Sequence, residues 1–197
     1  MIDPLSAAEY FIVRAYEDKT DADMTNMKLQ KLLYYAQSLH LALYDEPLFD
    51  EDVQAWRYGP VCPSAYAFYC DYASNQLPIP TCETLSSAPL EIKKLLEEVW
   101  GIFGMHNAYS LSDMTHEELP WKIARGDLPR QAMSKEPLSL TEMKKIGKSK
   151  LAEIERSHPA YEPVMERVLA NALSQKPSKA NCIEKEDVRD WLESLLD

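Results

Sequence analysis

The sequence predicts a mostly α protein: a compact multi-helix domain with minor short extended segments and a C-terminal helical extension. Apolar residues recur at intervals of three and four along several segments, which is the spacing of one buried helix face. Alternation typical of a half-buried strand is confined to residues 53–56. Of the 197 residues, 46% are hydrophobic and 27% are charged, which are the proportions of a folded globular chain.

The N-terminal part of the chain should form two helices. The first covers residues 6–17 and opens with a capping box, in which Ser6 is the cap and Glu9 follows three residues later. The second begins with Thr25 or Asn26 as its N-cap and ends before Pro47. Its buried face consists of apolar residues at helical spacing, namely Leu29, Leu32, Leu33, Ala36, Leu39 and Leu43.

A rigid, aromatic-rich corner follows the second helix. Residues 53–56 are the best candidate for an extended segment, and residues 56–63 combine two aromatics, an arginine, a glycine and two prolines, which fix the backbone path. Pro63 suits the first turn of a helix that should run to about Tyr72. Residues 77–80 contain two prolines and should be extended.

The rest of the chain should be helical. One helix covers residues 90–103 and stops at Gly104, another opens with a capping box at residues 110–113, and a short one begins at Pro120. Two more helices are expected at 141–158 and 163–175. The expected organisation is a domain at 1–145, a helical extension at 146–175, a linker at 176–183 and an amphipathic C-terminal helix at 184–197.

The composition points to a cytoplasmic protein. The longest nearly unbroken apolar run, residues 99–105, is far shorter than the roughly 20 residues of a spanning helix. The N-terminus lacks the pattern of a secretory signal. The four cysteines show no CxxC pair and no regular spacing, which fits reduced thiols better than disulfides or a zinc site: Cys62, Cys70, Cys82 and Cys182.

The charge is negative overall and unevenly distributed. The net charge of −11 argues against general binding to nucleic acid and would suit a basic partner protein. Residues 122–150 are an exception, with eight basic and three acidic side chains. A solvated helix face explains this basic segment better than a nucleotide site, although a small nucleotide-binding enzyme remains an alternative.

No constellation of catalytic or metal-binding residues is recognisable. Five glycines leave no room for a phosphate-binding loop, and His116-Glu-Glu118 lacks the second histidine of a zinc protease motif because Pro120 stands in its place. We therefore expect no enzymatic activity, no cofactor and no metal. His40 and His116 are interpreted as structural, hydrogen-bonded histidines.

Four motifs occur in a fixed order along the chain. They are the helix segment 26–37, Pro47-Leu-Phe-Asp-Glu51, Trp56-Arg-Tyr-Gly-Pro-Val-x-Pro63 and Thr115-His-x-Glu-x-Pro-Trp121. Together they resemble the signature of the Panacea antitoxin domain, also called SocA-like or GepA-like, over about Leu5 to Lys145. Several separated motifs in register are more specific than any single one.

This resemblance implies an antitoxin of a bacterial or phage toxin–antitoxin pair that neutralises its toxin by direct binding. One branch of the family implies an alternative, an adaptor that delivers the toxin to a protease. Autoregulation by DNA binding is a weaker alternative because the chain is acidic. The signature residues are expected to specify the scaffold: Lys28, Leu29, Gln30, Lys31, Leu32, Trp56, Gly59, Pro60, Pro63, His116, Pro120 and Trp121.

The candidate partner contacts lie at the corner, on the second helix and near the C-terminus. Arg57 should either pair with Glu51 or Glu118 or reach the partner. Two adjacent tyrosines should not be equally buried, because neighbours on a helix point about 100 degrees apart. One of them is either exposed as a partner contact or packed on the neighbouring helix with its hydroxyl in water. Trp56, Tyr58 and Trp121 are favoured as core anchors. The full set of candidate contacts is Tyr34, Tyr35, Arg57, Tyr58, Trp191, Leu192 and Leu195.

Overall fold

The computed structural model describes residues 1–80, 89–129 and 131–157. The chain divides into two compact units, Met1–Glu153 and Ile154–Asp197. The expected helix at 163–175, linker at 176–183 and C-terminal helix at 184–197 lie outside the described residues, and so do Trp191, Leu192 and Leu195. None of the helices in the described part is both long and apolar enough to cross a membrane.

The predicted mostly α fold class is confirmed. The helices of the described residues are α1 (Pro4–Glu17), α2 (Asn26–Tyr44), α3 (Pro63–Phe68), α4 (Leu90–Phe103), α5 (Ala108–Glu117), α6 (Leu119–Arg125) and α7 (Leu140–Ser157). Short 3-10 turns occur at Asp21–Asp23 and Cys70–Tyr72. The strands β1 (Gln54–Trp56) and β2 (Gly59–Val61) form a small antiparallel hairpin.

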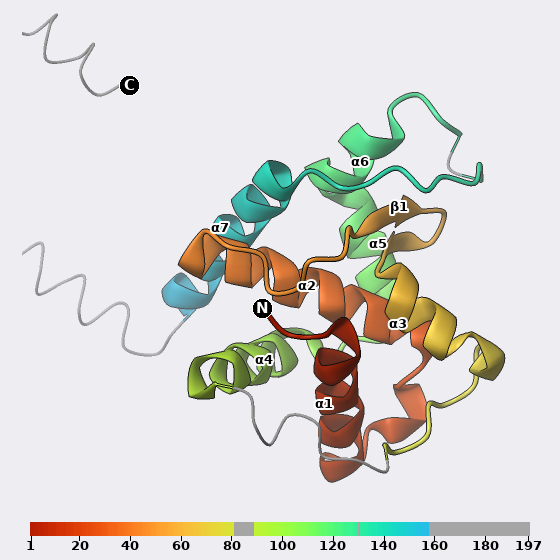
Figure 1. Cartoon of the computed structure of the whole chain (residues 1–197), viewed down its shortest axis with the longest axis vertical. Helices are drawn as coiled ribbons and strands as arrows, with labels where there is room; N and C mark the ends of the chain where they lie inside the picture. The colour runs from red at the N-terminus through yellow and green to blue at the C-terminus, as the bar shows by residue number, and fades with distance from the viewer. Residues whose placement is uncertain (81–88, 130, 158–197) are drawn as a thin grey trace, which may run out of the picture. The chain divides into compact units, whose positions relative to one another are not determined.

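Helix α2 is the centre of the first unit (Figure 1). It packs against α1, α3, α4, α5 and the hairpin, and nearly every residue from Lys28 to Leu41 is buried. The sequence predicted one buried face, but the surrounding elements cover all sides of the helix. Side chains that are polar therefore become part of the core, including Lys28, Gln30, Lys31 and Gln37.

The starts of two helices differ from the prediction. Asp3 caps α1 in place of Ser6, because its carboxylate accepts a hydrogen bond from the Leu5 amide at 2.8 Å and Pro4 fits the first turn. Asn107 caps α5 in place of Ser110 by accepting from the Ser110 amide at 2.9 Å. In both cases an earlier side chain reaches the exposed amides of the first turn.

The hairpin contains the predicted extended segment as β1 and a second strand that the sequence did not reveal. The middle pair is Ala55 opposite Pro60. Pro60 has no N–H group, and the outward amide of Ala55 donates instead to the carbonyl of Glu136 at 2.8 Å. The Ala55 carbonyl accepts from Arg125 Nη1 at 3.3 Å, so the chain near residue 136 and helix α6 both hold β1.

Two elements after the hairpin fix its surroundings. Helix α3 starts at Pro63 as predicted but ends at Phe68, and a 3-10 turn replaces its expected continuation to Tyr72. Helix α7 matches the prediction to within one residue at each end. Gly147 of α7 lies so close to α2 that a Cβ atom there would be 2.0 Å from the Ser38 carbonyl oxygen.

Candidate binding site

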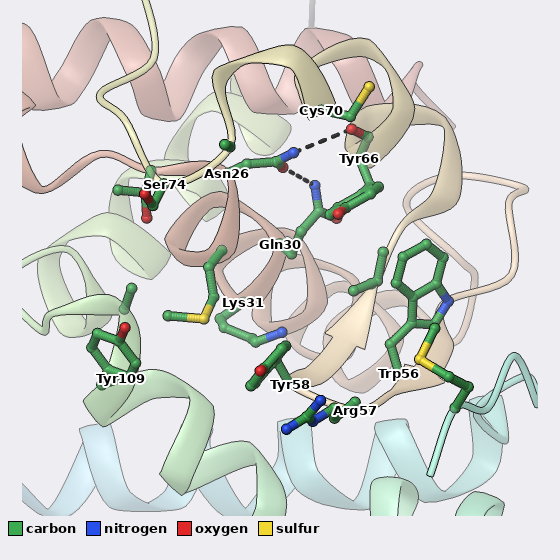
Figure 2. Close-up of a pocket in the computed structure, with 16 residues that line it drawn as sticks. Asn26, Gln30, Lys31, Trp56, Arg57, Tyr58, Tyr66, Cys70, Ser74 and Tyr109 are labelled. Carbon is green, nitrogen blue, oxygen red and sulfur yellow. Dashed lines mark hydrogen bonds between the residues drawn. The ribbon is translucent and has the colours of Figure 1, made fainter. Parts of the chain in front are cut away.

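A cavity of about 680 Å³ opens beside the N-terminal end of α2 (Figure 2). Its walls come from α2, the hairpin, α3 with the turn after it, the start of α5 and one residue of the chain between α6 and α7. The lining residues are Thr25, Asn26, Met27, Gln30, Lys31, Trp56, Arg57, Tyr58, Val61, Tyr66, Cys70, Ala73, Ser74, Ala108, Tyr109 and Met133.

One wall is fixed by a chain of amide hydrogen bonds. Asn26 Nδ2 donates to the Tyr66 carbonyl at 3.1 Å, and Gln30 Nε2 donates to Asn26 Oδ1 at 2.9 Å (Figure 2). Gln30 Oε1 in turn accepts from the backbone amide of Cys62 at 2.9 Å. These contacts fasten α3 and the end of the hairpin to the first turns of α2, and they use the amide groups internally.

Lys31 is a buried cation on the cavity wall. Only 1% of its surface is exposed, and its Nζ donates to the Pro60 carbonyl at 2.8 Å. Burial lowers the pKa of Lys31 to about 7, and the nearby Cys62 opposes this shift only in part. Burying a charged ammonium without a neighbouring carboxylate disfavours the protonated form, because the lost hydration is not replaced by an opposite charge.

Gly59 makes room for Lys31. Its φ of +98° is a conformation that side chains disfavour, and a Cβ atom there would lie 2.7 Å from Thr115 Oγ1 and 2.8 Å from Lys31 Cε. Glycine at this position therefore lets the hairpin, α2 and α5 meet closely.

Arg57 forms neither of the internal pairs that were considered for it. Glu51 accepts from the amide and hydroxyl of Ser64, and Glu118 is occupied elsewhere. The Arg57 guanidinium lies over the ring of Tyr58 at 4.9 Å. Its Nε is buried and finds no acceptor among the described residues.

The rim of the cavity is aromatic and exposed. Tyr58 is 55% exposed, and Tyr109 and Met133 are each 76% exposed. Of the three predicted core anchors, Trp121 is buried and donates from Nε1 to the Trp56 carbonyl at 2.8 Å, but Trp56 is only half-buried. The prediction for Tyr58 as a core residue is wrong, because the hairpin turn carries its ring outward.

The expectation that Tyr34 or Tyr35 is exposed is also wrong. Both are 0% exposed, because neighbouring elements enclose α2 on all sides. Their hydroxyls donate to the two carboxylate oxygens of Glu118 at 2.6 and 3.0 Å, and the Tyr35 ring stacks on Phe103. Burial raises the pKa of Glu118, while the two hydroxyl groups oppose that rise.

Both histidines have the structural roles that were predicted. The His40 ring nitrogen Nδ1 lies 2.7 Å from the carbonyl oxygen of Glu46, which ties the end of α2 to the following loop. His116 Nε2 lies 3.1 Å from the carbonyl oxygen of Arg57, and its ring packs on Trp121 with centroids 4.3 Å apart. His116 therefore holds the hairpin turn against α5 and α6.

The remaining signature residues lie in the scaffold. Lys28 is buried with its ammonium 5.7 Å from the Trp100 ring, Leu29 and Leu32 are in the core, Pro63 opens α3 and Pro120 stands in the first turn of α6. In the basic segment 122–150, four lysines form surface ion pairs with carboxylates: Lys122, Lys144, Lys145 and Lys150. They fit the solvated face that the sequence predicted.

Sequence reasoning missed several lining residues. Lys31 and Gln30 were assigned only to the scaffold, and Asn26, Tyr109 and Met133 were not singled out for the site. The available signal was the position of Gln30 and Lys31 between Leu29 and Leu32 of the buried face. Nothing local marks Tyr109 or Met133, which reach the cavity from distant segments. Within the described residues no group of histidine, cysteine or acidic side chains could hold a metal ion.

A comparison with protein families matches a region that includes most of the residues lining this cavity. The profile of the family described as "Antitoxin SocA-like, Panacea domain" matches residues 29–122. Antitoxin SocA of Caulobacter vibrioides (strain NA1000 / CB15N) is 36% identical over 67 residues, which are 32% of this chain and 36% of that protein. The match therefore spans well under half of the relative's own length. No solved structure matches the chain. Residues 29–122 of the chain thus match the SocA-like, Panacea antitoxin family that the four sequence motifs resemble.

Proposed function

We propose that this protein is a non-enzymatic, cytoplasmic antitoxin that neutralises a cognate protein toxin by binding it directly. The observation that carries the proposal is the family match, which covers most of α2, the hairpin, α5 and the start of α6. The role of the Caulobacter relative, named an antitoxin, is transferred here as part of the proposal.

The exposed rim of the cavity is the surface that we assign to the toxin. Tyr58, Tyr109 and Met133 are large, accessible side chains around a concave site, and Arg57 lies beside them. Tyrosine and arginine are enriched among the residues that dominate binding energy at protein interfaces. The rigid hairpin and helix that carry these residues reduce the entropy lost on binding.

Co-expression with the product of the neighbouring gene tests the proposal. We expect that product to stop growth when expressed alone, and to be harmless and recovered in a complex when this chain is present. A product that is harmless alone, or that stays toxic and unbound in the presence of this chain, would refute direct neutralisation. Toxin abundance distinguishes two routes: simple blocking leaves the toxin in place, whereas delivery to a protease removes it.

Rim substitutions locate the interface. Tyr58→Ala combined with Tyr109→Ala should weaken toxin binding about tenfold to a hundredfold, the range expected when interface hot spots are truncated. Tyr44→Ala is the matched control, because Tyr44 is also about half exposed but lies at the opposite end of α2. Calorimetric titration measures the affinities, and thermal melting checks the fold. Equal affinity of the rim variant and the control would place the interface elsewhere.

A further inference from the structure

The cavity beside α2 is cationic in an acidic protein. The chain has 32 acidic and 21 basic side chains, yet none of the 16 residues that line the cavity is an aspartate or glutamate. Two of them are cations, Lys31 and Arg57. The charge inside the cavity is therefore opposite in sign to that of the chain.

Both cations keep hydrogen-bonding capacity in the described structure. The Lys31 ammonium has three N–H donors, and its hydrogen bond there is with the carbonyl of Pro60. Arg57 has a buried Nε without an acceptor, and neither residue forms an ion pair with a carboxylate of the described residues. A buried cation is unfavourable without a counter-charge, so an anion bound at this wall would offset that cost.

The start of α2 adds to the positive potential. Thr25, Asn26 and Met27 line the cavity at the N-terminus of this 19-residue helix, where the helix dipole favours negative charge. The side-chain amides of Asn26 and Gln30 bond to each other and to the backbone, so they form the wall and leave Lys31 and Arg57 as the specific donors.

The rest of the cavity suits a flat apolar body. Trp56 and Tyr66 form a tilted ring pair with centroids 4.8 Å apart, and Tyr58 and Tyr109 add two further rings to the lining. A volume of about 680 Å³ falls inside the range of roughly 300–1,000 Å³ that is usual for small-molecule pockets. Aromatic walls of this kind favour offset or edge-on packing against a ring.

We infer that this cavity binds a small organic acid, with its carboxylate at Lys31 and Arg57 and its flat apolar or aromatic body among Trp56, Tyr58, Tyr66 and Tyr109. A carboxylate offers two planar acceptors and one negative charge, which one ammonium and one guanidinium edge can satisfy. A phosphate group would call for more donors, such as the glycine-rich loops that the sequence lacks. The inference concerns the chain by itself and does not depend on the toxin.

Matched pairs of acids and amides test the inference on the purified full chain. The probes are indole-3-acetate and 3-phenylpropionate, each compared with its uncharged amide at pH 6.5, below the Lys31 pKa of about 7. We expect both acids to raise the melting temperature and to bind at least tenfold more tightly than their amides in calorimetric titration. No shift with either acid at millimolar concentration, or equal binding of acids and amides, would overturn the inference.

Variants assign the binding to the two cations. Lys31→Met and Arg57→Gln should each lower the affinity for the acids at least tenfold and leave the amides unchanged. Lys28→Met is the matched control, because Lys28 is equally buried on the same helix but does not line the cavity. Should Lys31→Met fail to fold, the half-buried Arg57→Gln decides alone. Acid binding that persists in Arg57→Gln, or an occupant found to be only a segment of a partner protein, would contradict the inference.

Discussion

Lys31 shows how a single side chain can lower the stability of its own fold. Its buried ammonium has exchanged water for the carbonyl acceptor of Pro60, and no carboxylate of the described structure is paired with it. Its pKa falls to about 7 because burial penalises the charged form. The buried charge of Lys31 therefore lowers the free energy of unfolding, and such destabilising residues are common where a side chain serves binding.

This shift predicts how stability depends on pH. Below pH 7, Lys31 is protonated in both the folded and the unfolded chain, and above its ordinary pKa of 10.5 it is neutral in both. Between these values the unfolded chain binds more protons, so the Lys31 contribution to the free energy of unfolding should rise by roughly 1 kcal/mol per pH unit. Urea denaturation at pH 7, 8 and 9 measures it.

Lys31→Met isolates this contribution. The free energy of unfolding of the variant should lose the part of its pH dependence that comes from Lys31. At pH 7 the variant should be at least as stable as the wild type, because burying an uncharged methionine carries no cost of charge desolvation. Lys135→Met, a substitution of an exposed lysine, should retain the wild-type slope. Identical slopes for wild type and Lys31→Met would show that Lys31 is not desolvated as described.

Single residues were predicted best where local chemistry decides their place. His40 and His116 could be read as structural because hydrogen-bonded histidines are common near helix ends. Tyr34 and Tyr35 could not be placed, since the exposure of a helix face depends on what packs against it. The burial of Lys31 could not be predicted for the same reason: a lysine is rarely buried, and only the carbonyl of Pro60 and the approach of Gly59 reveal that this one is.

At the scale of elements, the contact between α2 and α7 depends on a missing side chain. Gly147 brings the two helices together so closely that an added Cβ would lie 2.0 Å from the Ser38 carbonyl oxygen and 2.8 Å from the Ala42 Cβ. Relieving such a contact would require a shift of the whole helix α2 or α7, because the Ser38 oxygen belongs to the helix backbone. The small residue therefore sets the distance between α7 and the central helix.

Gly147→Ala should consequently destabilise the protein by roughly 1–3 kcal/mol, the usual cost of overpacking, despite the better helix propensity of alanine. Gly101→Ala is the matched control: Gly101 is an exposed helical position in α4 with nothing within 4 Å of an added Cβ. Gly101→Ala should stabilise the protein by about 0.5–1 kcal/mol. The denaturant concentrations at the unfolding midpoints of the two variants measure both effects. Equal effects would mean that α7 is not seated on α2 in this way.

Elements were predictable from sequence where one chain segment holds all the information. The spacing of Leu29, Leu32 and Leu33 predicts α2, and Pro63 predicts the start of α3. Strand β2 was not predicted because its middle residue is Pro60, and a proline normally argues against a strand. Proline is compatible here because the backbone groups of the Ala55–Pro60 pair face outward, so no hydrogen bond between the strands needs a Pro60 N–H. The outward amide of Ala55 bonds to Glu136, a contact across 81 positions of the chain that no local pattern encodes.

At the scale of the molecule, net charge should govern how fast a toxin is captured. With a net charge of −11, the chain should attract a basic toxin, and the association rate constant should fall roughly tenfold or more as ionic strength rises from low to high salt. The dissociation rate constant should change much less. Stopped-flow mixing at several salt concentrations measures both. An association rate that does not vary with salt would argue against a complementary, basic partner surface.

The site as a whole could not be predicted, although the family could. The motifs at residues 26–37 and 56–63 mark chain regions that meet at the cavity, but Tyr109 and Met133 on its rim lie outside both motifs. Tertiary contacts bring these two residues to the cavity, among them the packing of α5 on α2 and the hydrogen bond between Ala55 and Glu136. Cavities assembled from separate segments depend on tertiary contacts, which a pattern of residue types does not specify.

The hairpin also limits the ways in which a partner can bind. Its outward-facing backbone groups at the middle pair are already used or missing: the Ala55 amide and carbonyl bond to Glu136 and Arg125, Pro60 has no amide hydrogen, and its carbonyl accepts from Lys31. Neither edge can therefore template an incoming strand at this point. Recognition at the hairpin must proceed through side chains, which lets different partners be distinguished by shape and charge, and the same closed edges guard the protein against strand-by-strand self-assembly.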